Sequence, residues 1–111
     1  MDFIKSKELY IELEEKVTQA EANGDPIEEL VKEQIELLWN LYEYFVKTSL
    51  EQNPKIENSM SYQEIKITQL LAIVELCKKV GMDSDKYETM IKEIRLKLLG
   101  EEMYAQFFGD K

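Results

Sequence analysis

Carboxylates recur at a helical spacing in the first half of this 111-residue chain. Four of them lie in one narrow strip on the surface of a predicted helix: Glu29, Glu33, Glu36 and Glu43. Magnesium takes oxygen ligands, so such a strip could supply one side of a divalent-metal site if a second helix offered a matching pair. The helix predicted to face it, residues 62–80, has only Glu64 and Glu75, which are too far apart in the sequence to form such a pair.

The chain contains no histidine. Enzymes most often recruit histidine as a general base near neutral pH, and zinc and iron sites use it as a ligand. The one compatible metal chemistry is that of all-α nucleotide pyrophosphohydrolases, which hold magnesium between paired carboxylates. Without a second carboxylate pair, this enzyme class ranks third among our hypotheses. We predict a non-enzymatic protein that uses no metal and no cofactor.

Acidic residues outnumber basic ones by 23 to 14, giving a net charge of -9, and the imbalance is concentrated in one half. Residues 1–53 carry a net charge of -8 and residues 54–111 a net charge of -1. Direct nucleic-acid binding requires clustered lysine and arginine, so this charge pattern argues against it. An acidic surface can instead orient a protein partner, or it can mimic nucleic acid and occupy the basic channel of a nucleic-acid-binding protein.

Size and composition predict one soluble helical domain spanning residues 1–111. The apolar fraction is 44% and the charged fraction 33%, as in folded globular proteins. The longest apolar run, residues 70–74, is far shorter than the roughly 20 residues of a membrane-spanning helix. The first residues show no secretory signal, and the lone Cys77 cannot form an internal disulfide, so we expect a cytoplasmic protein. Lysines outnumber arginines thirteen to one, a bias of AT-rich genomes such as those of low-GC bacteria and their phages.

Turn residues divide the chain into helices. Asn23-Gly24 ends a first amphipathic helix, and Asp25-Pro26 is expected to cap a second one that runs to about Glu51. Ser61 is expected to cap a third, Tyr62 to Val80, and Gly81 to end it. A fourth helix ends at Gly100 and a short helical tail follows. The fold class is therefore all-α, a compact antiparallel bundle of four helices with a short C-terminal helical tail.

The second helix is apolar over most of its circumference. One predicted seam contains Ile27, Val31, Gln34, Leu38, Leu41 and Phe45, and a second stripe contains Ile35, Trp39, Tyr42 and Val46. Such a helix is either central in its bundle or presents an apolar face to a partner. If two copies paired through this helix, Gln34 is the residue expected to fix their register.

Six aromatic residues are the predicted anchors for a protein partner: Trp39, Tyr42, Tyr44, Tyr104, Phe107 and Phe108. Core packing is the more common role for each, and the terminal Phe107-Phe108 pair is expected to plug one end of the bundle. Cys77 is expected to be inert core filler.

We therefore predict a small binding module, an adaptor, chaperone or inhibitor, that recognises another protein through apolar helix faces flanked by glutamates. Homodimerisation is the alternative use of the same surface. The acidic nucleic-acid mimic is the second hypothesis.

Overall fold

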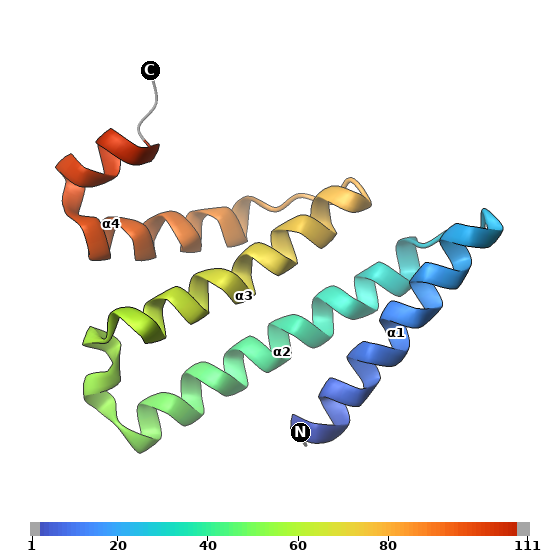
Figure 1. Ribbon diagram of the computed structural model, residues 1–111, viewed down its shortest axis with the longest axis horizontal. Coiled ribbons are helices and arrows are strands. Elements are labelled where there is room, and N and C mark those ends of the chain that lie inside the picture. The colour runs from blue at the N-terminus through green and yellow to red at the C-terminus, as the bar shows by residue number, and fades with distance from the viewer. Residues whose placement is uncertain (1–2, 109–111) are drawn as a thin grey trace.

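The computed structural model describes residues 3–108, which form four α-helices joined by short connections (Figure 1). In chain order the elements are α1 (Phe3–Asn23), α2 (Glu28–Gln52), the 3-10 helix η1 (Pro54–Asn58), α3 (Met60–Lys79) and α4 (Asp85–Phe108). No strand occurs within these residues, so the predicted all-α bundle with its C-terminal helical tail is confirmed. None of the four helices described here has an apolar stretch long enough to cross a membrane.

The first helix ends where the sequence predicts, because a glycine can take the backbone conformation that the turn requires. Gly24 has φ +74°, in the left-handed region that side chains with a Cβ disfavour. Its neighbour Asp25 donates its backbone N–H to the Ala20 carbonyl at 2.8 Å, which satisfies one of the last carbonyls of α1.

The starts of α2 and α3 differ from the predicted ones. Asp25 does not cap α2, because its backbone already belongs to the end of α1; Ile27 is the N-cap residue, and no side chain caps this helix. Ser61 does not cap α3 either. The cap is Ser59, whose hydroxyl accepts a hydrogen bond from the Tyr62 N–H at 3.3 Å. Ser59 takes this role because η1 ends just before it and leaves it extended.

The helices form a flattened layer. Within the described residues, helix backbones pack only in chain order, α1 on α2, α2 on α3 and α3 on α4, and consecutive helices run antiparallel (Figure 1). The molecule measures 47 × 41 × 17 Å, and its radius of gyration is 16.1 Å. A compact domain of this length has a radius of gyration of about 13 Å, and one helix with its side chains is about 10–12 Å thick. The helices therefore lie side by side in a thin layer (Figure 1), and grooves between neighbouring helices are open to solvent.

Two groups of buried side chains form the core. The first joins α1, α2 and α3 and contains Val17, Val31, Ile35, Ile73 and Cys77. The second joins α2, α3 and α4 and contains Tyr42, Leu70, Val74, Ile91 and Ile94. Trp39 and Tyr87 pack against both groups and connect them. Both groups contain residues of α2 and α3, so these two helices lie at the centre of the fold. They are also the two helices whose sequences are apolar over most of their circumference.

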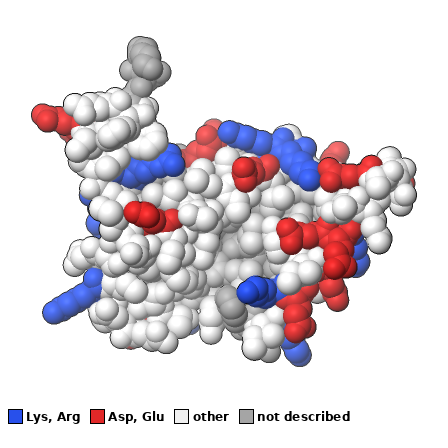
Figure 2. Space-filling view, viewed as in Figure 1, with Lys and Arg blue, Asp and Glu red and all other residues white. Residues whose placement is uncertain are grey.

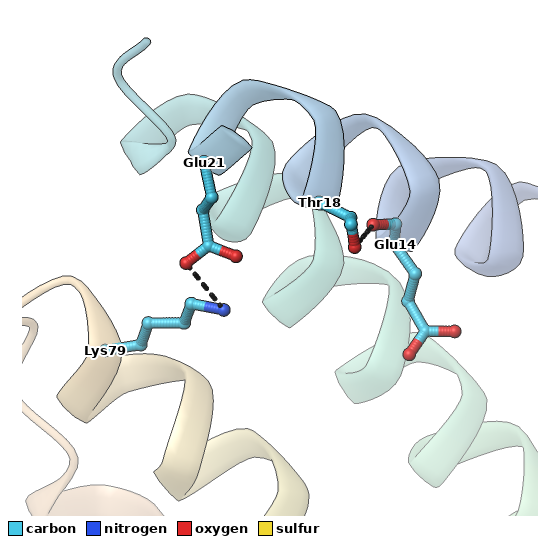
Figure 3. Close-up of polar contacts among 4 residues, drawn as sticks. All are labelled: Glu14, Thr18, Glu21 and Lys79. Atoms are coloured by element: carbon cyan, nitrogen blue, oxygen red, sulfur yellow. Dashed lines mark hydrogen bonds and ion pairs between the residues drawn. The ribbon is translucent and has the colours of Figure 1, made fainter. Parts of the chain in front are cut away.

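An ion pair links α1 to α3 at the end of the layer where α1 turns into α2. Glu21 lies 3.2 Å from the Lys79 ammonium, and both side chains are partly exposed (Figure 3). An exposed pair of this kind contributes about 0–1 kcal/mol. In the same view, the Thr18 hydroxyl donates to the Glu14 carbonyl at 2.9 Å, a contact internal to α1. Apolar packing around Val17, more than charge, therefore holds α1 in place.

The C-terminal tail turns away from the axis of α4 at Gly100. This residue has φ +80° and ψ 164°, a non-helical conformation that glycine alone adopts readily. Residues 101–108 then form further helical turns that lie beside α4 at the edge of the layer (Figure 1).

Candidate functional site

A groove between α1 and α2 combines an apolar floor with acidic walls. Leu9, Leu13 and Leu37 supply its apolar side chains, and its volume is about 320 Å³. Leu13 and Leu37 are buried, whereas Leu9 is 50% exposed and offers apolar surface to a ligand. Leu9 and Leu13 lie one helical turn apart on α1, which places both on the side facing α2.

Three glutamates line the same groove. Glu12 comes from α1, and Glu33 and Glu36 come from α2. Lys16 is the one basic residue among the lining residues, so the groove carries a net charge of -2. We name this site the acidic groove. Figure 2 shows acidic side chains gathered over the part of the layer formed by α1 and the first half of α2.

The predicted acidic strip is exposed along α2. Its four members, Glu29, Glu33, Glu36 and Glu43, all lie on the solvent side of the helix, and Glu29 is 3.7 Å from Lys32. Nowhere in the described part of the chain do three or more His, Cys, Asp or Glu side chains converge to hold a metal ion. The geometry therefore lends no support to a magnesium site between Glu33, Glu36 and the third helix.

Two of the predicted anchors are core residues. Tyr42 is 5% exposed, and burial together with the neighbouring Tyr62 raises the pKa of its hydroxyl to about 12. Trp39 is partly buried and stacks on Tyr42 with ring centroids 5.3 Å apart. It also meets the edge of Tyr87 at 5.6 Å, and the Lys86 ammonium lies 4.2 Å from its ring centroid. These rings face α4, which leaves neither available as a free anchor.

Tyr44 lies on the surface of α2. It is 44% exposed, more than any other aromatic side chain of this helix. Of the three aromatic anchors predicted on α2, Tyr44 is therefore the one that a partner can reach.

The tail residues do not plug the bundle as expected. Phe107 is 67% exposed, and Phe108 is also exposed. Phe108 packs on Tyr104 with ring centroids 5.3 Å apart, and the Arg95 guanidinium carbon lies 4.4 Å from the Phe108 ring centroid. The physical reason is the bend at Gly100, which carries the aromatic side chains over α4 and away from the end of the layer.

A second cleft lies between α3, α4 and the tail. Its volume is about 380 Å³, and three basic residues, Lys78, Lys92 and Arg95, line it together with Asp85 and Glu88. Its apolar lining consists of Leu71, Val74, Ile91 and the ring of Tyr104. We name this site the basic cleft. In Figure 2, basic side chains are visible below the tail, away from the acidic side of the layer.

Two interior polar groups bear on earlier expectations. Gln34 is buried within the chain, and its side-chain oxygen has no hydrogen-bond partner among the described residues, so it is not exposed to set the register of a dimer. Cys77 is fully buried, and this burial, with a smaller contribution from Asp83, raises the pKa of its thiol. A thiol with a raised pKa and no access to solvent is unreactive, as expected for core filler.

No protein-family model matches this chain, and comparisons with curated proteins and with solved structures give no match. Sequence reasoning identified the acidic strip but missed Leu9, Leu37 and Arg95, because the angles between helices decide which side chains meet in a groove.

Proposed function

We propose that this chain is a non-enzymatic binding module, an adaptor, chaperone or inhibitor, that holds a segment of another protein in the acidic groove. The observation that carries the proposal is the combination of a leucine floor with three glutamates in one open groove. An apolar side chain of the partner packs on Leu9, and lysine or arginine residues beside it pair with Glu33 and Glu36. The apolar contact supplies affinity, and the charges orient the partner and speed its encounter.

The dimensions of the groove suit a short helical or extended segment. Its lining on α1 runs from Leu9 to Lys16, which is about 10 Å of helix at a rise of about 1.5 Å per residue. That length matches roughly two turns of a partner helix, enough for one or two apolar side chains. Helix-in-groove recognition uses this arrangement of a few apolar anchors flanked by polar contacts.

The acidic nucleic-acid mimic is the second candidate, supported by the exposure of the whole strip on α2. Its charge density is low for this role. From Glu29 to Glu43 the strip covers about 21 Å with four charges, or about one per 5 Å, at the helical rise of about 1.5 Å per residue. Duplex DNA carries about one charge per 1.7 Å of its axis. Binding by a nucleic-acid mimic would involve only its charges and not the leucine side chains of the groove. The binding-module proposal accounts for both the leucines and the glutamates.

Matched variants of the chain, used as bait in a lysate of a low-GC bacterium, test the proposal. Glu33→Lys/Glu36→Lys reverses charges in the groove, and Glu14→Lys/Glu15→Lys makes the same change in net charge at exposed positions of α1 outside it. We expect the first pair to reduce capture of the partner by about tenfold or more and the second to have a much smaller effect. Equal losses in both pairs would show that only the overall charge of the chain matters, which would contradict binding in the acidic groove.

Leu9→Ser tests the apolar contribution against Ile11→Ser. Both side chains are about half exposed on α1, but only Leu9 lines the acidic groove. Loss of a buried leucine contact weakens binding by about tenfold or more, so Leu9→Ser should reduce capture while Ile11→Ser leaves it unchanged. Partner capture that is insensitive to Leu9→Ser and is abolished by double-stranded DNA would favour the mimic.

A further inference from the structure

Arg95 is the only arginine among the 14 basic residues of the chain, and it lies in the basic cleft. Its guanidinium carbon is 4.4 Å from the centroid of the Phe108 ring, within the range of a cation-π contact. Across residues 3–108 the guanidinium forms no hydrogen bond or ion pair, so its N–H groups remain available. Those groups form the planar fork that binds a carboxylate or a phosphate through two parallel hydrogen bonds.

The bend at Gly100 creates this contact. Phe108 follows Arg95 by thirteen residues, so in a straight helix the two would be about 20 Å apart along the axis at a rise of about 1.5 Å per residue. The non-helical conformation of Gly100 turns the tail back so that Phe108 reaches Arg95 and Tyr104 lines the cleft. The tail thus places an aromatic ring against the guanidinium and supplies Tyr104 to one side of the cleft.

Two lysines add to the positive charge around Arg95. Lys92 precedes it by three residues on α4, and Lys78 reaches the cleft from α3. Within residues 3–108, none of these three cations forms an ion pair with a carboxylate. Of the two acidic residues that line the cleft, Glu88 already accepts a hydrogen bond from the Ser84 hydroxyl. A chain with a net charge of -9 therefore keeps three cations unpaired in one cleft.

We propose that the basic cleft binds a small organic oxyanion, a carboxylate or a phosphate ester with an apolar body. Arg95 holds the oxyanion through two hydrogen bonds, and Lys78 and Lys92 add charge on either side. The apolar body packs on Leu71 and the ring of Tyr104. The volume of about 380 Å³ falls in the range of sites for small molecules. This site is separate from the acidic groove and does not depend on the function proposed there.

A single arginine gives a direct readout, since its side-chain Nε–Hε group produces one NMR signal. We would titrate the full chain with phenyl phosphate and, separately, with phenylacetate, using sodium chloride at matched ionic strength as the control. We expect at least one probe to shift the Arg95 signal in a saturable way in the millimolar range, and the tighter one identifies the oxyanion. The proposal is overturned if neither probe shifts the signal beyond the sodium chloride control.

Variants test which groups hold the probe, with affinities measured from the backbone amides of the cleft. Arg95→Lys keeps the charge but removes the fork, so binding should weaken by about tenfold or more. Lys92→Gln should also weaken it, whereas Lys97→Gln, the same change on α4 outside the cleft, should not. Phe108→Leu should weaken binding by about two- to fivefold through loss of the cation-π contact with Arg95. Unchanged affinity in Arg95→Lys contradicts the assignment.

Discussion

Replacing Trp39 and Phe107 separately with alanine tests whether core and surface aromatics have been assigned correctly. Trp39 packs against both buried groups and contacts Tyr42 and Tyr87, so its loss should remove much of the side-chain packing between α2 and α4. Truncating a packed tryptophan costs about 3–5 kcal/mol, and we expect about 3 because the ring is partly exposed. Phe107 is 67% exposed, so Phe107→Ala should cost about 0.5 kcal/mol or less.

The loss expected for Trp39→Ala is a substantial fraction of the free energy of unfolding. A domain of this length has a free energy of unfolding of about 5–15 kcal/mol, so Trp39→Ala should remove a substantial part of it. At about 4 °C per kcal/mol, the melting temperature should fall by about 12 °C. Urea denaturation followed by far-ultraviolet circular dichroism measures both variants without relying on tryptophan fluorescence. A loss below about 1 kcal/mol for Trp39→Ala, or above about 1.5 kcal/mol for Phe107→Ala, would refute the packing described here.

Three further predictions concern buried polar groups. Burial raises the pKa of Tyr42 from 10.0 to about 12, so the contribution of its neutral hydroxyl to stability is complete below pH 10 and is lost as the pH rises through 12. In urea titrations at a series of pH values, Tyr42→Phe should reduce the fall in the free energy of unfolding between pH 10 and 12. Gln34→Met should stabilise the fold by about 1 kcal/mol, since it removes a buried acceptor without a partner, and a thermal melt that shows destabilisation would contradict this. Cys77 should resist alkylation by iodoacetamide in the folded protein and react once the protein is unfolded in urea, which mass spectrometry can measure. Labelling of the folded protein as fast as of the unfolded protein would show that Cys77 is not buried.

The helices could be predicted because local chemistry determines most of their limits. Gly24 and Gly81 both have positive φ and end α1 and α3 as their positions in the sequence indicate. The helix starts were harder to predict because several residues compete for each cap. Ser59 and Ser61 are both suitable, and the length of η1 decided between them.

The candidate sites could be predicted only in part. The acidic strip follows from helical periodicity alone, so Glu33 and Glu36 were identified correctly as exposed. Whether Trp39 faces solvent or α4 depends on how α4 crosses α3, and no local pattern encodes that angle. The contact between Arg95 and Phe108 likewise depends on the direction of the bend at Gly100.

Site-specific photo-crosslinking tests the central claim most directly. A benzophenone side chain would replace Leu9 in one variant and Ile11 in the other, and each would be irradiated in bacterial lysate with and without double-stranded DNA. Leu9 lines the acidic groove, whereas Ile11 is similarly exposed on α1 but lies outside it. The proposal predicts one protein adduct from position 9, through a segment rich in lysine or arginine, that persists in the presence of DNA. Equal adducts from both positions, or loss of the position 9 adduct when DNA is added, would contradict it.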